Sequence, residues 1–238
     1  MSKIISVINQ KGGSGKTSFA TMACIALAEK GKKVLAIDCD PQGGLSYFLC
    51  PGAKDNMSEV LLRKIVNPHT SCYDGVDIYT SSSSIDCMYF GLSDFAFKPV
   101  LKMVDSLELG YKYDYIIFDT PPTMQGITRA AIHVSDQIFV PCELSKPALE
   151  PTYYALKCIE ELEKKGLVIF VSSDIGNTGH RKEIEIMFRN RIGDNYAGTI
   201  KRGLQAQKIV SGDIKLTPNK IATYLQPIYD LIEGETIE

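Results

Sequence analysis

The sequence has no run of apolar residues long enough to span a bilayer, and its amino terminus has no basic region followed by a long apolar stretch. We therefore expect neither a membrane span nor a signal peptide. A strong excess of charge is also absent, because 26 Lys and Arg residues stand against 28 Asp and Glu residues, a net charge of −2. The chain is thus not a wholly basic nucleic-acid coat, and any binding to a polyanion must come from a local patch.

The seven cysteines include no Cys-x-x-Cys pair. This absence argues against a zinc or iron–sulfur site formed within one chain. An odd number of widely spaced cysteines is typical of proteins in a reducing compartment. We therefore expect a cytoplasmic protein in which most cysteines act as small buried hydrophobic residues.

The chain does have a globular composition, with 45% hydrophobic and 23% charged residues among its 238. Short β-rich apolar runs alternate with helical stretches, which predicts an α/β fold, a mostly parallel twisted sheet with helices on both faces. We see no internal repeat or long linker and expect a single domain over residues 1–238. Strands are expected at Lys3–Ile8, Lys33–Ile37, Val76–Thr80, Tyr113–Phe118, Gln137–Val140, Leu167–Ser172 and Ala197–Ile200. Helices are expected at Thr17–Glu29, Met57–Val66, Ser93–Leu109, Ile127–Val134, Ala148–Lys165, Arg181–Arg191 and Asn219–Ile232.

The most specific motif is the glycine-rich segment Asn9–Thr17, which follows an expected strand and opens an expected helix. Glycines let backbone N–H groups approach phosphate oxygens closely, and the helix N-terminus adds partial positive charge. In such a loop Lys16 reaches the β- and γ-phosphates, and the Thr17 hydroxyl holds Mg²⁺. The segment therefore predicts a site for the phosphates of a nucleotide.

This loop departs from the general P-loop pattern at Gln10, where that pattern has glycine, and it carries Lys11 before two glycines. It resembles the deviant Walker A loop, KGGxGK[ST], of the ParA/MinD family of P-loop ATPases. The resemblance implies ATP and Mg²⁺ as cofactors and a homodimer formed around two ATP molecules, with Lys11 reaching the partner's nucleotide. It implies nucleotide contacts by Lys11, Gly12, Gly13, Ser14, Gly15, Lys16, Thr17 and Ser18.

Two further segments resemble the same family. Asp38 and Asp40 lie in an Asp-Cys-Asp-Pro-Gln sequence after the second expected strand, and two such residues at i and i+2 point to the same side. The apolar strand from Tyr113 leads into Asp119 and Thr-Pro-Pro, like a Walker B strand. The resemblance implies a catalytic role for Lys11, Lys16 and Asp40, which orients water. It implies a metal site of Thr17, Asp38 and Asp119.

The resemblance covers most of the chain from residue 3 to about 165 and is weaker beyond. There, Asn177 is the candidate for the family's asparagine near the adenine. Lys201 stands after Ile200 where the family has proline. Between Gly176 and Lys215, eight Lys and Arg residues face four Asp and Glu residues, a local excess of +4 that suits contacts with phosphates.

These observations favour a small ParA-type ATPase of weak intrinsic activity that partitions plasmids or chromosomes. By the resemblance, its ATP-bound dimer binds DNA without sequence preference, and a centromere-binding adaptor of the ParB type stimulates hydrolysis and release. With the loop beginning at residue 11, we expect no helix-turn-helix domain before it, and a nucleoid-associated location. The candidate DNA-binding residues are Arg189, Lys201, Arg202 and Lys208.

Three alternatives remain. A MinD-like membrane ATPase needs a basic amphipathic terminal helix, but no Lys or Arg follows Lys220 and the chain ends in acidic residues, so core packing is the favoured role of that helix. A relative of the nitrogenase iron protein would share a cluster between subunits, with Cys87 and Cys142 as candidate ligands. The cargo of a ParA-like ATPase can also be a cytosolic protein assembly.

Overall fold

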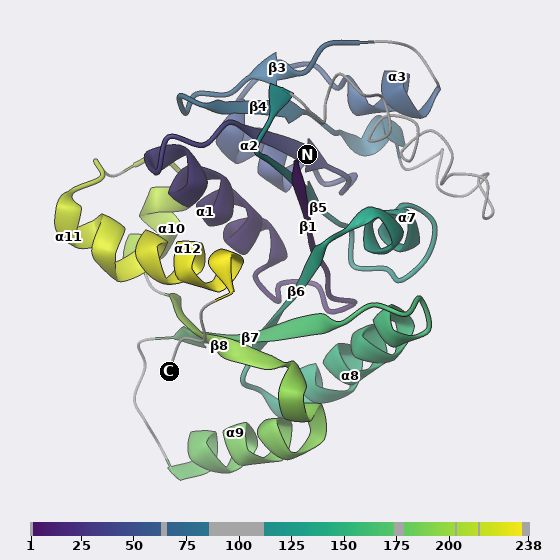
Figure 1. Ribbon diagram of the computed structural model, residues 1–238, viewed down its shortest axis with the longest axis vertical. Coiled ribbons are helices and arrows are strands. Elements are labelled where there is room, and N and C mark those ends of the chain that lie inside the picture. The colour runs from purple at the N-terminus through teal and green to yellow at the C-terminus, as the bar shows by residue number, and fades with distance from the viewer. Residues whose placement is uncertain are drawn as a thin grey trace.

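A computed structural model of the chain describes residues 2–62, 66–85, 112–173, 179–202, 204–213 and 215–234. In these residues eight strands form one sheet in the order β3-β4-β2-β5-β1-β6-β7-β8 (Figure 1). All neighbouring pairs are parallel except β3 with β4. The strands are β1 (Lys3–Val7), β2 (Val34–Asp38), β3 (His69–Thr70), β4 (Val76–Tyr79), β5 (Tyr115–Asp119), β6 (Gln137–Glu143), β7 (Gly166–Ser173) and β8 (Tyr196–Arg202).

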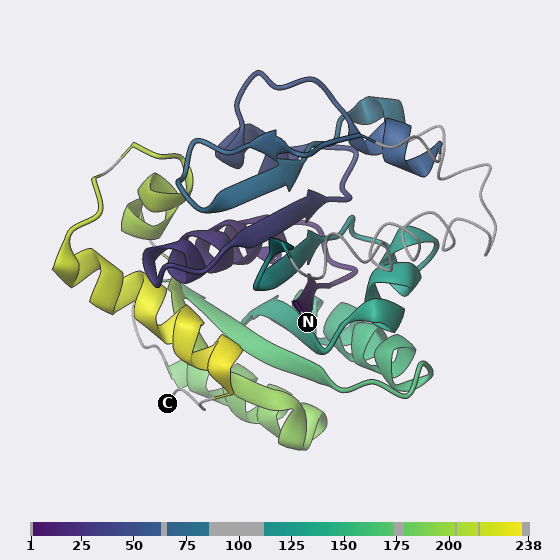
Figure 2. The same ribbon diagram turned by 45° about the horizontal axis from the view of Figure 1, so that its top comes forward.

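Helices cover both faces of this sheet (Figures 1 and 2). One face carries α1 (Lys16–Glu29), α2 (Gly44–Leu49), α10 (Leu204–Val210) and a run made of α11 (Pro218–Lys220), the π-helical turn η4 (Ile221–Leu225) and α12 (Gln226–Glu233). The other face carries α3 (Met57–Leu61), α7 (Ile127–Val134), α8 (Lys146–Glu160) and α9 (Gly179–Ile192). Short 3-10 turns lie at η1 (Ser83–Ile85) and η3 (Gly193–Asn195).

The core follows from the alternation of side chains along each strand. Ile5 and Val7 of β1 pack with Phe19 of α1 in the largest buried cluster, whereas Ile138 and Val140 of β6 face the helices α8 and α9. Every residue of α1 from Phe19 to Leu27 is buried. A helix that is apolar on all sides must be covered on all sides, and α2, α10 and α12 supply that cover.

The predicted α/β architecture is confirmed, and most predicted elements appear within a few residues of their expected bounds. The short elements α2, β3 and α10 were not predicted. The predicted helix at Ser93–Leu109 lies outside the described residues. That residues 1–238 form a single domain stays a prediction.

Strand β6 was predicted to end at Val140, and the next residue, Pro141, lacks the N–H that a central strand donates. It continues to Glu143. The ladder between β6 and β1 ends at Phe139. On that side no partner strand therefore requires an N–H from Pro141. The Pro141 carbonyl instead accepts a hydrogen bond from Asn9 Nδ2 at 2.8 Å. The extension carries Glu143 to the same sheet edge as the glycine-rich loop.

Candidate functional site

The glycine-rich loop joins the end of β1 to the first residue of α1, Lys16. Gly13 and Gly15 have left-handed backbone conformations, with φ of 73° and 98°, which side chains rarely allow. A Cβ atom added to Gly12 or Gly13 would meet nothing within 4 Å, so that side of the loop is open. The Ser14 hydroxyl is buried and has no hydrogen-bond partner among the described residues. The loop thus combines open backbone with an unpaired donor, as a phosphate site requires.

Asn9 fastens the start of this loop. Its side-chain amide donates to the Pro141 carbonyl, and its Oδ1 accepts the Lys11 N–H at 3.0 Å. Because these bonds use both ends of one amide, the loop is tied to β6 as well as to β1.

Lys16 places a cation under the loop. The residue is only 6% exposed, and its Nζ donates to the Lys11 carbonyl at 3.3 Å. Burial lowers the pKa of Lys16, whereas Asp119 and Asp40 oppose that shift. Binding of a phosphate group beside Lys16 would add to the effect of these carboxylates and favour the charged amine.

Asp38 and Asp119 lie side by side because β2 and β5 are adjacent and parallel, with Asp38 in register with Asp119. Asp38 Oδ1 accepts the Asp40 N–H at 3.0 Å. Its Oδ2 accepts the Ser46 N–H at 2.7 Å and the Ser46 hydroxyl at 2.6 Å. Burial raises the pKa of Asp38 to about 6 despite these hydrogen bonds. Asp38 is therefore held in one orientation by the start of α2.

Asp119 is different, because both of its buried carboxylate oxygens lack a hydrogen-bond partner among the described residues. Burial and then the Asp38 carboxylate raise the pKa of Asp119 well above its usual range, while Thr17 and Lys16 oppose that shift. An unpaired buried carboxylate beside a second carboxylate fits a site that receives a cation. The described residues hold no cluster of three or more His, Cys, Asp or Glu side chains that could bind a metal ion. Mg²⁺ suits such a site when phosphates and water complete its ligands.

Thr17 lies between Asp119 and the start of α2. A Cβ atom on Gly44, the first residue of α2, would approach Thr17 Cγ2 to 3.1 Å. Asp40 accepts the Gln42 N–H on Oδ1 at 2.9 Å and stays partly exposed at the rim. The structure therefore brings together Lys16, Thr17, Asp38, Asp40 and Asp119 at one sheet edge, and their roles in binding phosphate and metal stay predictions.

Lys11 is held by residues that sequence reasoning missed. Its Nζ lies 3.2 Å from Glu143 Oε2 and 3.3 Å from Ser145 Oγ. The side chains of Lys11 and Glu143 are 25% and 46% exposed. Glu143 could have been found as a carboxylate at a strand end, had β6 not been expected to end at Val140. Ser46 had no such signal, because α2 was not predicted.

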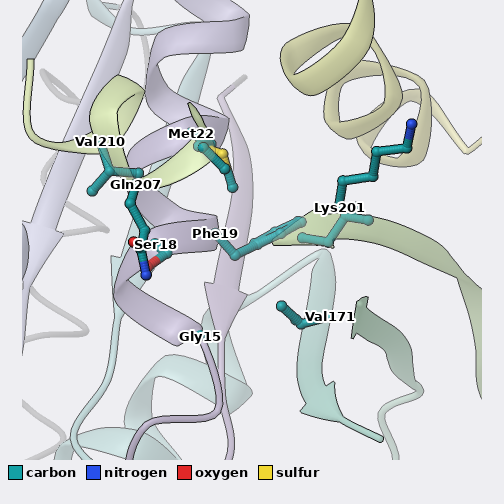
Figure 3. A pocket seen from close by; sticks show the side chains of 10 residues that line it. Gly15, Ser18, Phe19, Met22, Val171, Lys201, Gln207 and Val210 are labelled. Carbon is teal, nitrogen blue, oxygen red and sulfur yellow. The ribbon is translucent and has the colours of Figure 1, made fainter. Parts of the chain in front are cut away.

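A small pocket of about 50 Å³ opens beside the loop, between the start of α1, the ends of β7 and β8, and α10 (Figure 3). Phe19 and Val171 face each other across it, and the Lys201 side chain extends away from Gly15. Its walls are Gly15, Ser18, Phe19, Met22, Val171, Ile200, Lys201, Ala206, Gln207 and Val210. Asn177, the candidate for adenine contact, lies outside the described residues.

The candidate DNA-binding residues occupy different surfaces. Lys201 and Lys208 are exposed on β8 and α10. Arg189 lies on α9, on the opposite face of the sheet from α10, where it pairs with Glu185 at 2.9 Å and stacks over the Tyr196 ring at 4.0 Å. Arg202 ends β8, and its side chain is not among the described ones.

Replacing Ser46 by alanine is expected to lower the free energy of unfolding by about 1–3 kcal/mol. The change removes the hydroxyl that donates to Asp38 and that accepts the Ser81 N–H at 2.8 Å, so two buried groups lose a partner. Urea denaturation followed by circular dichroism measures the loss. The exposed Ser83 is the control, and an equal loss for Ser83→Ala would contradict the prediction.

The chain is similar to several known proteins. A family profile described as an AAA domain matches residues 2–170. The chromosome partitioning protein ParA of Caulobacter vibrioides is 30% identical over 169 residues, which cover 67% of this chain and 63% of the relative. The maintenance of carboxysome distribution protein A of Synechococcus elongatus is 24% identical over 93% of this chain and 94% of the relative. An ATP complex of Cyanothece McdA shares the fold, with a TM-score of 0.84 and 18% identity over 98% of this chain and 96% of that one. The chain therefore belongs to the ParA family of deviant Walker A ATPases.

Proposed function

We propose that the protein is an ATP-driven switch that partitions DNA, with a dimer that forms on ATP, binds DNA without sequence preference and is released by hydrolysis. The proposed ATP hydrolysis rests on one observation, the unpaired Asp119 carboxylate beside Lys16 under an open phosphate loop. The proposed role in DNA partition is supported by the similarity to a relative named as a chromosome partitioning protein.

In this proposal the loop amides and Lys16 bind the β- and γ-phosphates, and Asp40 orients the attacking water. Thr17 and Asp119 would hold Mg²⁺, with Asp38 beside them, and the ion would supply positive charge to the phosphates. The nucleoside lies toward the pocket of Figure 3, because Gly15 and Ser18 belong both to the loop region and to the pocket wall.

Lys11 is the proposed link between nucleotide and dimer. Two stacked nucleotides bring much negative charge together, and a lysine supplied by the partner lowers the cost of that approach. In the single protomer Lys11 is paired with Glu143. Exposed ion pairs of this kind are worth at most about 1 kcal/mol, so a partner's phosphates can displace the carboxylate.

Lys201, Arg202 and Lys208 are the proposed DNA contacts, at the end of β8 and on α10. Arg189 is the weaker candidate, because its guanidinium already pairs with Glu185 and stacks on Tyr196. A dimer doubles each remaining cation, so DNA affinity rises by avidity. A ParB-type adaptor that recognises the centromere and stimulates hydrolysis is the proposed partner.

A protein assembly is the second candidate cargo, favoured by the carboxysome-distribution relative that aligns along 93% of this chain. Both candidates use the same nucleotide switch. A membrane role has less support, since the apolar side chains of α12, Ile228, Leu231 and Ile232, are buried with α1 in the core. No helix among the described residues is long and apolar enough to cross a bilayer.

Salt-dependent co-sedimentation with DNA tests the switch. We expect retention with ATP and little with ADP or without nucleotide. Exchanging Lys201 and Lys208 for glutamate should weaken retention on every sequence and flatten the slope of log affinity against log salt by about one per lysine. Changing the exposed Lys165 to glutamate, the control, should leave the slope unchanged. Equal retention in all three nucleotide states would refute the proposal, and ATP-dependent binding to anionic vesicles instead of DNA would favour the membrane role.

A further inference from the structure

Two cysteines lie next to each other at a distance from the nucleotide phosphates. Cys50 follows the last residue of α2, and Cys72 lies between β3 and β4. Both thiols are free. Cys72 is exposed and Cys50 is half-buried, whereas the other described cysteines, Cys24, Cys39, Cys142 and Cys158, are buried. Among the described cysteines, solvent therefore reaches this pair.

A backbone hydrogen bond fixes the spacing of the two cysteines. The Cys72 N–H donates to the Leu49 carbonyl at 2.8 Å. Cys50 is bonded to that carbonyl carbon, so covalent geometry places the two Cα atoms no more than about 7 Å apart. Disulfides are found with Cα atoms separated by about 4.4–6.8 Å. The pair is thus within reach of a disulfide with little movement of the backbone.

The thiols also point across this contact. Cys50 Sγ donates to the Thr70 carbonyl at 3.4 Å, and Cys72 Sγ donates to the Phe48 carbonyl at 3.6 Å. Each thiol therefore lies against the chain segment that carries the other. Burial and then the neighbouring Cys72 raise the pKa of Cys50, a sign that the two sulfur atoms are close enough to interact.

We propose that Cys50 and Cys72 form a redox site that closes to an intrachain disulfide by exchange with a low-molecular-weight disulfide. The Cys72 thiolate attacks one sulfur of that reagent, which forms a mixed disulfide and releases one small thiol. The Cys50 thiolate then attacks Cys72 Sγ and releases the second small thiol. Two electrons and two protons pass from the cysteines to the reagent. Cys72 reacts first because it is the more exposed of the two.

The closed disulfide would fasten α2 at its carboxyl end. One turn earlier, the Ser46 carbonyl accepts the Cys50 N–H at 2.9 Å, and the N–H and hydroxyl of Ser46 hold Asp38. On the other side, the Tyr73 hydroxyl donates to the Ile209 carbonyl of α10 at 3.1 Å. The crosslink therefore joins two segments, one of which reaches the Asp38 carboxylate and the other α10.

The experiment incubates the full chain, without nucleotide, in defined mixtures of oxidised and reduced glutathione. Free thiols are then blocked and the peptides are mapped by mass spectrometry. We expect a peptide pair linking Cys50 and Cys72, lighter by two hydrogens and restored by dithiothreitol. Closure should raise the thermal midpoint by about 5 °C, because the crosslink restricts the unfolded chain.

Two serine variants separate the steps. Cys50→Ser should stop at a glutathione adduct on Cys72, and Cys72→Ser should give neither an adduct on Cys50 nor a crosslink at the same mixture. Cys158→Ser, a change at a buried cysteine, is the control and should close as the unmodified chain does. A stable glutathione adduct on Cys72 of the unmodified chain, or unreacted Cys50 and Cys72 in the most oxidising mixture, would overturn the proposal. Neither outcome depends on ATP or DNA, so the proposed function is tested separately.

Discussion

Replacing Lys16 by alanine is expected to lower kcat/KM for ATP hydrolysis by at least about 100-fold, because the variant removes the cation proposed to bind the β- and γ-phosphates. The Lys16 side chain is buried, and its Nζ is already directed to the loop at the Lys11 carbonyl. A cation preorganised in a desolvated site contributes far more than one in water. Release of phosphate in a coupled assay measures the loss, and titration with a fluorescent ATP analogue separates binding from hydrolysis.

The control for this variant is Lys33→Ala, at an exposed lysine that precedes β2. It should hydrolyse ATP at the unmodified rate. Circular dichroism must show that Lys16→Ala is folded, because the variant leaves Asp119 without its nearest cation. A folded Lys16→Ala protein that retains hydrolysis would show that the phosphate site has been assigned wrongly.

Lys11 and Glu143 are expected to give opposite results on dimer formation. Lys11→Ala should lower hydrolysis by about 100- to 1000-fold and abolish ATP-dependent association, because the cation offered to the partner's nucleotide is lost. Glu143→Gln keeps the size of the side chain but removes the charge that holds Lys11 at 3.2 Å. Loss of an exposed ion pair in the protomer should tighten the ATP-bound dimer by about two- to five-fold. Sedimentation equilibrium with ATP and magnesium measures both.

Glu161→Gln is the matched control, since Glu161 also pairs with a cation on the surface, Arg129, at 3.7 Å. It should leave the dimer constant unchanged. If Glu143→Gln weakened the dimer instead, Glu143 would be a contact of the dimer and not a restraint on Lys11.

The sequence predicted the part of the site that lies next to strong local signals. Lys16, Thr17, Asp38 and Asp119 directly follow apolar strands or a glycine loop, and parallel strands bring their carboxyl ends to one edge. Helices α1 and α7 were predicted to within one residue of their bounds, because the residues that indicate each helix lie within one segment of the chain.

What the sequence did not predict depends on contacts between distant segments. Helix α2 has six residues, too few to show a period, and it is held by Ser46 binding Asp38 and Ser81. Glu143 was missed because the end of the β1 ladder decides whether β6 can pass through Pro141. The sequence grouped Arg189 with Lys208 as DNA-binding candidates. Only the structure shows that their helices, α9 and α10, cover opposite faces of the sheet.

The strand order has a consequence for how such a protein can change over evolutionary time. The groups assigned to phosphate and metal come from four adjacent strands in the middle of the sheet, β2, β5, β1 and β6. The candidate DNA-binding lysines and arginines lie instead on β8, at one end of the sheet, and on the helices α9 and α10. Under the proposed function, substitutions at that flank can therefore replace one cargo with another while the groups assigned to phosphate and metal keep their positions. One nucleotide site could in this way serve proteins that position different cargoes.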